Sequence, residues 1–91
     1  MFFITTVSED GKSTRCVGYF KDLKEAKERV KKNYCDIFEF LYKYAVIEKV
    51  PEGIYRGIDS EYWFEIDLEK LEYKEIEKPE QFEGYICFGI G

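Results

Sequence analysis

The fold is decided by the stretch from residue 14 to residue 30, Thr14-Arg15-Cys16-Val17-Gly18-Tyr19-Phe20-Lys21-Asp22-Leu23-Lys24-Glu25-Ala26-Lys27-Glu28-Arg29-Val30. Its first part is rich in β-branched and aromatic residues, which is typical of a strand. Asp22 is followed three residues later by Glu25, the pattern of a capped helix N-terminus. The stretch therefore predicts a strand over residues 14–20 and a helix over residues 22–34. The apolar stripe of that helix comprises Leu23, Ala26, Val30 and Tyr34.

A second β-rich run, residues 2–7, precedes this strand. The Asp10-Gly11 pair between the two runs favours a two-residue type I′ turn, because both turn positions need a positive φ. That turn would set Ile4 opposite Val17 and Phe2 opposite Tyr19, on one face of the hairpin. The other face would carry Phe3, Thr5, Val7, Cys16 and Gly18. Neither face is cleanly polar, so we expect both faces to be covered.

Three further strands are expected after the helix. Residues 44–50 form an apolar run that stops at Pro51, and residues 62–68 and 71–77 alternate between apolar and polar side chains. The last two runs predict a second hairpin. Residues 79–82 resemble one turn of helix that begins with a proline. Residues 35–44 are compatible with an extension of the helix, with a strand and with an apolar loop.

Together these patterns predict a single α+β domain over residues 1–91. We expect an antiparallel sheet of four to five strands in β-β-α-β-β order, with one helix packed on one face. The second face would be covered by the apolar tail of residues 85–91, by another subunit or by a partner. We therefore assign Tyr85, Phe88 and Ile90 to an oligomer or partner surface, and we expect a homo-oligomer, a dimer or higher.

Composition excludes several function classes. The chain has 14 basic and 19 acidic residues and a net charge of −5, which disfavours DNA and RNA polymers as partners. The basic cluster of residues 27–32 is interrupted by Glu28, and we interpret it as a solvated helix face. The absence of histidine removes the commonest general base and every His-containing zinc site. We expect neither catalysis nor a metal or other cofactor.

The three cysteines, Cys16, Cys35 and Cys87, form no C-x-x-C pair, and we interpret each as a small buried apolar residue. The first residues lack the basic and long apolar regions of a signal peptide, and no apolar run approaches the roughly 20 residues needed to span a bilayer. We therefore expect a reduced cytoplasmic protein without membrane contact.

The aromatic residues, 19% of the chain, exceed what one small core can hide. Tyrosine and tryptophan are typical of binding surfaces, and their rings can stack on nucleobases, although a half-exposed sheet also favours them. The candidate binding residues are Tyr55, Arg56, Tyr62 and Trp63, where Arg56 could meet a carboxylate or phosphate. Lys12 and Arg15 offer a second, weaker anion-facing patch. Glu65 and Asp67 share a strand face that we interpret as solvated.

Several segments carry a resemblance to a known kind of protein: Phe3-Ile4-Thr5-Thr6, Val17-Gly18-Tyr19-Phe20, Asp22-Leu23-Lys24-Glu25-Ala26, Tyr62-Trp63 and Lys78-Pro79-Glu80. In these segments the chain resembles small α+β proteins of uncharacterised function from bacteria and their phages. The resemblance implies a sheet with one helix packed on it and an origin in a phage or mobile element. It transfers no catalytic or binding residue.

The function expected from these observations is that of a non-catalytic binding module. It would be a phage-encoded inhibitor of bacterial defence that binds a host protein in the cytoplasm of the bacterial host. The acidic charge suits a basic partner, because long-range fields steer association. The alternative is a binder of a nucleotide-like small ligand, a sponge for a nucleotide signal that uses aromatic and arginine side chains.

Overall fold

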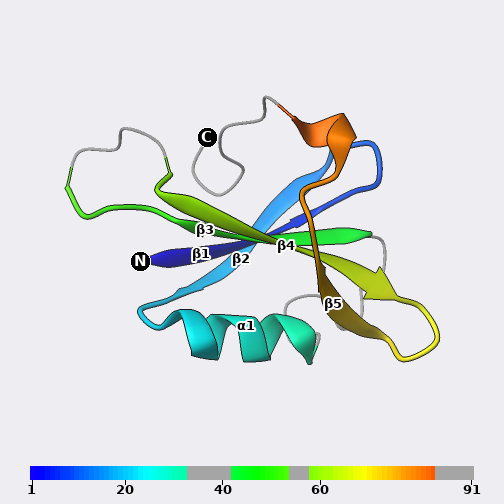
Figure 1. The fold of residues 1–91 in the computed structure, drawn as a ribbon, viewed down its shortest axis with the longest axis horizontal. Coiled ribbons are helices and arrows are strands. Elements are labelled where there is room, and N and C mark those ends of the chain that lie inside the picture. The colour runs from blue at the N-terminus through cyan, green and yellow to red at the C-terminus, as the bar shows by residue number, and fades with distance from the viewer. Residues whose placement is uncertain (33–41, 54–57, 84–91) are drawn as a thin grey trace.

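The fold is an antiparallel five-stranded sheet with one helix on one face (Figure 1). The computed structural model describes residues 1–32, 42–53 and 58–83. The elements follow the order β1 (Phe2–Val7), β2 (Thr14–Phe20), α1 (Leu23–Lys31), β3 (Tyr44–Lys49), β4 (Ser60–Asp67), β5 (Glu72–Ile76) and the short 3-10 helix η1 (Glu80–Phe82). The strands lie in the order β2-β1-β3-β4-β5. The predicted α+β class and β-β-α-β-β order are confirmed.

Helix α1 begins where the capping pattern predicts. The carboxylate of Asp22 accepts a hydrogen bond from the backbone N–H of Glu25 at 3.0 Å. Ala26 and Val30 are wholly buried against the sheet, as their spacing predicts. The helix ends earlier than the predicted residue 34, because Lys32 leaves the helical conformation and caps it with a backbone bond to the Glu28 carbonyl. Residue 34 lies outside the described residues.

The β1–β2 hairpin has the predicted register from Thr5 to Val7, where Thr5 pairs with Cys16, but not from Phe2 to Ile4. Phe2 pairs with Phe20 and Ile4 with Gly18, and a bulge after Ile4 leaves Val17 as an extra residue in β2. The bulge moves Tyr19 to the face that lies away from α1, where it pairs with Phe3. The predicted grouping of Tyr19 with Phe2 was therefore wrong.

The predicted type I′ turn was also wrong, because a longer loop of residues 8–13 joins the two strands. The carboxylate of Asp10 accepts hydrogen bonds from the Ser8 hydroxyl at 2.7 Å and from the Lys12 backbone N–H at 2.9 Å. Gly11 alone in this loop has a positive φ, 75°. An aspartate that bonds the backbone two residues on stabilises a local turn without the two positive φ angles of a type I′ turn.

The sheet is buried on both faces, so the molecule has two apolar cores. The core beneath α1 comprises Ile4, Ala26, Val30, Ala45, Ile47, Phe64 and Tyr73. The core on the opposite face comprises Val7, Tyr44, Val46, Trp63 and Phe82. Full burial of each large apolar side chain contributes about 1.5–3 kcal/mol to folding. Five of the described aromatic residues lie in these cores. Two cores bury more rings than the single core that was assumed from the sequence.

The second core is covered by η1, on the side of the sheet opposite α1 (Figure 1). Pro79 precedes this short helix, as the sequence predicts, and its Phe82 side chain is 1% exposed. The Gln81 side chain donates a hydrogen bond to the Glu9 carbonyl at 2.8 Å, which ties η1 to the β1–β2 loop. The predicted cover by residues 85–91, and the structure of residues 35–41, lie outside the described residues.

Candidate functional site

The predicted aromatic and arginine site is not assembled on one surface. Tyr62 and Trp63 are neighbours in β4, and successive strand residues point to opposite faces of a sheet. Tyr62 packs against the core beneath α1, whereas Trp63 belongs to the core on the other face. Tyr55 and Arg56 lie outside the described residues, as do Tyr85, Phe88 and Ile90.

The ring of Trp63 is covered. It stacks on the Phe82 ring with centroids 5.2 Å apart and an interplanar angle of 12°. The Tyr44 ring packs against it edge to face, with the centroids 6.3 Å apart. Trp63 is only 2% exposed. A nucleobase could therefore stack on Trp63 only after Phe82 had moved. In this conformation Trp63 is a core residue and no ligand can reach its ring.

Lys12 is exposed in the loop of residues 8–13, and Arg15 is exposed near the start of β2. Lys43 pairs with Glu9 of the same loop at 3.4 Å. The hydrogen bond that the Lys43 ammonium donates to the Glu9 carboxylate raises the pKa of Lys43. The backbone N–H of Lys12, followed by the Ser8 hydroxyl, lowers the pKa of Asp10. Charges of both signs thus lie together around this loop.

Glu65 and Asp67, which the sequence places on one strand face, have separate partners. Glu65 lies 3.8 Å from the ammonium of Lys43. Asp67 accepts hydrogen bonds from the backbone N–H groups of Glu69 at 3.0 Å and Lys70 at 3.4 Å, and so stabilises the β4–β5 turn. These contacts account for both carboxylates without a ligand.

Unlike the other four strands, strand β2 has no fully buried residue. Thr14, Arg15, Cys16 and Tyr19 are exposed. The interpretation of Cys16 as a buried residue was wrong, because β2 is an edge strand and Cys16 points away from the core beneath α1. Cys35 and Cys87 lie outside the described residues. We call residues 14–20 the β2 edge.

Tyr19 is the aromatic residue of the β2 edge that meets solvent. It is 63% exposed, whereas the five aromatic residues of the two cores are 5% exposed or less. Its ring lies 5.7 Å from the ring of its cross-strand neighbour Phe3, at an angle of 44°. The pair forms an aromatic surface beside a line of backbone groups at the edge.

The opposite edge strand, β5, has a different character. Its exposed side chains are Glu72, Lys74 and Glu75, all of them charged. Glu75 also pairs with Lys27 of α1 at 3.2 Å, which joins this edge to the helix. Short, charged edge strands resist the addition of another strand. The two edges therefore offer unequal surfaces to a partner.

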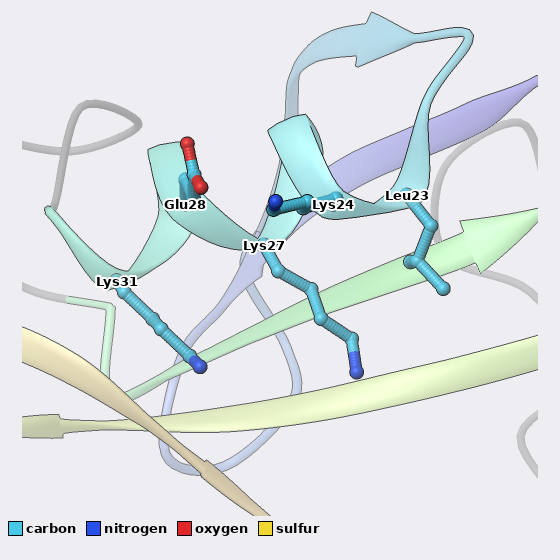
Figure 2. A pocket seen from close by; sticks show the side chains of 5 residues that line it. All are labelled: Leu23, Lys24, Lys27, Glu28 and Lys31. Carbon is cyan, nitrogen blue, oxygen red and sulfur yellow. The ribbon is translucent and has the colours of Figure 1, made fainter.

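A hollow of about 550 Å³ lies along α1, lined by Leu23, Lys24, Lys27, Glu28 and Lys31 (Figure 2). We call it the α1 hollow. The Lys27 ammonium lies 4.6 Å from the centroid of the Tyr62 ring as well as against Glu75, so this lysine is held in place. The sequence interpretation as a solvated helix face overlooked this hollow. The spacing of Lys24, Lys27 and Lys31 was the signal that could have indicated it.

No group of three or more cysteine, aspartate and glutamate side chains in the described ranges is arranged to hold a metal ion. None of the helices in those ranges is long and apolar enough to cross a membrane. Comparison of the chain with protein-family models, curated proteins and solved structures finds no match. The resemblance to bacterial and phage proteins therefore stays a prediction.

Proposed function

We propose that the protein is a non-catalytic binding module that contacts a partner protein through the β2 edge. The observation that supports this most is the exposure of that edge, with Tyr19 63% exposed beside Phe3. An edge strand presents backbone N–H and C=O groups that can pair with an extended segment of another chain. Main-chain hydrogen bonds would supply affinity, and contacts of alternate side chains would supply specificity.

The contrast between the two edges supports the choice of β2. Strand β5 is short and carries charged side chains, whereas β2 has seven residues, of which Arg15 alone is charged. The bulge at Val17 twists β2 and limits a partner to a short segment on either side of it. The Tyr19 and Phe3 rings would then contact an apolar side chain of the incoming segment.

The partner that we propose is a host protein of a bacterial cell, bound by a phage-encoded inhibitor of defence. The net charge of −5 favours association with a basic protein, because complementary fields raise the rate of encounter. The alternative function, a nucleotide sponge that uses Tyr62, Trp63 and Arg56, has less support. Phe82 covers Trp63, and Tyr62 lies on the other face of the sheet.

The experiment compares the wild-type protein with Tyr19→Lys and with Leu68→Lys. An edge lysine opposes strand addition. Leu68 is 73% exposed in the turn after β4, so its substitution changes charge equally without touching β2. Each protein is immobilised and incubated with bacterial lysate, and the retained proteins are quantified by mass spectrometry. The amide hydrogen exchange of the wild type is then measured with and without the purified partner.

A partner of the β2 edge will be retained by the wild type and by Leu68→Lys, and retention by Tyr19→Lys will fall about tenfold or more. The bound partner will slow amide exchange in residues 14–20. Equal retention by all three proteins, or slowed exchange confined to other strands, contradicts the proposal.

The same variants test the expectation that the protein forms a homo-oligomer. A second copy that added its own β2 would extend the sheet through a symmetric edge contact. Light scattering at high micromolar concentration would then show a dimer or higher oligomer for the wild type and a smaller species for Tyr19→Lys. A strictly monomeric wild type contradicts this expectation. The β2 edge would then be open for a partner protein.

A further inference from the structure

We propose that the α1 hollow binds a chain of phosphate groups, an oligophosphate that is free or carried by a nucleotide. The site is distinct from the β2 edge and uses lysines of the helix.

The charge of the α1 segment is opposite to that of the chain. Residues 21–32 contain six basic and three acidic side chains, although the whole chain has a net charge of −5. Lys24 and Lys31 make no ion pair with any described residue. Two ammonium groups at the hollow are therefore available to an anion, in addition to the paired ammonium of Lys27.

The helix places these lysines on one flank. At 100° per residue, Lys24, Lys27 and Lys31 lie within about 60° of one another around the helix axis. Ala26 and Val30 face the sheet, so the lysine row runs along the side next to β5, where Glu75 contacts Lys27. In Figure 2 the Lys27 and Lys31 side chains extend in the same direction, whereas the Glu28 carboxylate points the opposite way.

The spacing suits several linked anionic groups. Lys24 and Lys31 are separated by seven residues, or about 10.5 Å along the axis. Their long side chains can converge on neighbouring phosphates, and lysine binds phosphate as a mobile point charge. Lys31 also lines an adjoining hollow of about 400 Å³, where the carboxylates of Asp67, Glu72 and Glu75 accompany Lys70 and Lys74. Because those carboxylates repel phosphate, the ligand ends at the α1 hollow.

The volume favours a small ligand over a protein segment. About 550 Å³ lies in the range of small-molecule sites. The lining includes Leu23 as its one apolar side chain, and Lys27 already covers the Tyr62 ring. Most of the lining surface is apolar, from Leu23 and the methylene stems of the lysines, so an anion would be held by the ammonium groups alone. The hollow offers no open aromatic face to a nucleobase, so free tripolyphosphate and nucleoside triphosphates should bind alike.

Two double variants test the site with equal changes in net charge. Lys24→Gln/Lys31→Gln removes the two available ammonium groups of the hollow. Lys21→Gln/Lys32→Gln removes two exposed lysines of the same segment that do not line it. Inorganic tripolyphosphate is titrated into each intact protein at low ionic strength, by calorimetry and by backbone and Tyr62 ring resonances. Adenosine and guanosine triphosphates form the second arm.

The wild type will bind tripolyphosphate saturably, with resonance changes centred on residues 23–31 and on Tyr62. The Lys24→Gln/Lys31→Gln variant will weaken the Kd about tenfold or more, and the control variant will change it less than about twofold. Glu28→Gln will tighten binding, because it removes a carboxylate from the lining. Tyr19→Lys will leave binding unchanged, which separates this test from that of the β2 edge.

Three results overturn the proposal. The first is the absence of saturable binding to the wild type. The second is equal weakening by both double variants, which would show an effect of net charge alone. The third is binding of one nucleoside triphosphate much more tightly than tripolyphosphate, which would place a nucleobase in a site that the hollow does not offer.

Discussion

The backbone of Gly11 lies directly against the ring of Phe82. A Cβ atom built on Gly11 would stand 2.7 Å from Phe82 Cε1, closer than van der Waals contact allows. Gly11 also has a φ of 75°, where a side chain strains the backbone. The β1–β2 loop can therefore pack against η1 only because residue 11 has no side chain.

Gly11→Ala is expected to lower the free energy of unfolding by about 2–3 kcal/mol, through backbone strain and the clash with Phe82. Gly53→Ala is the matched control. Gly53 also has a positive φ, 106°, but open space surrounds its Cα. We expect that variant to lose about 1 kcal/mol in urea unfolding. Equal losses in the two variants would contradict the close contact.

Phe82→Ala is expected to cost about 3–5 kcal/mol, because the ring is 1% exposed and leaves a cavity over Trp63. Trp63 is the only tryptophan of the chain, so its fluorescence reports on the site directly. The emission maximum of the folded variant should shift to longer wavelength as water reaches the indole. Phe82→Leu, which keeps part of the cover, should shift it less. An unchanged maximum in Phe82→Ala would show that another group covers Trp63.

The Asp10 carboxylate is expected to titrate below its usual pKa of 3.8, because the Lys12 N–H and the Ser8 hydroxyl stabilise its charged form. Its folded pKa is thus lower than its unfolded pKa. The stabilisation is present above the unfolded value and is lost as the pH falls through the folded value. Unfolding in urea from about pH 6 to about pH 2 should show a shallower acid dependence for Asp10→Asn than for the wild type. Identical slopes, or a carboxyl titration at 3.8 by NMR, would refute this expectation.

Cys16 is expected to react with a thiol reagent in the folded protein, because its side chain is exposed on the β2 edge. Peptide mapping after brief alkylation should find Cys16 modified at a rate close to that in urea. Cys16→Ser is the control for the assignment of the modified peptide. Strong protection of Cys16 in the isolated protein would show that the edge is covered, which would also remove the main support for a partner at β2.

The sequence was sufficient to predict the elements whose signals are local. The Asp22 cap, the spacing of Ala26 and Val30 and the alternation of residues 62–67 each depend on neighbours within a few positions. The hairpin register was not predictable in the same way. Asp10-Gly11 also suits a longer loop. The bulge at Val17 lies beside Gly18, and a glycine inside a strand indicates a bulge without fixing its position or the register beyond it.

The candidate surfaces depended on contacts between distant segments. Trp63 was expected to face a ligand, but its burial depends on Phe82 of η1, which no periodicity in β4 reveals. Lysines at positions 24, 27 and 31 were expected in solvent. The hollow among them requires the helix to lie beside β5, where Glu75 and Tyr62 hold Lys27. The burial of Trp63 and the hollow along α1 both depend on contacts between distant segments, which residue type alone does not predict.

The hydrogen bond from Gln81 to the Glu9 carbonyl has a consequence for biosynthesis. Its two residues are 72 positions apart. At a translation rate of about 5–20 residues per second, the loop that contains Glu9 leaves the ribosome on the order of ten seconds before η1. Trp63 precedes Phe82 by 19 positions. For about 1–4 seconds the Trp63 face of the nascent sheet therefore lacks Phe82, and it offers apolar surface to chaperones and to neighbouring chains. Completion of the fold is therefore a late event of synthesis, timed by the emergence of residues 79–83.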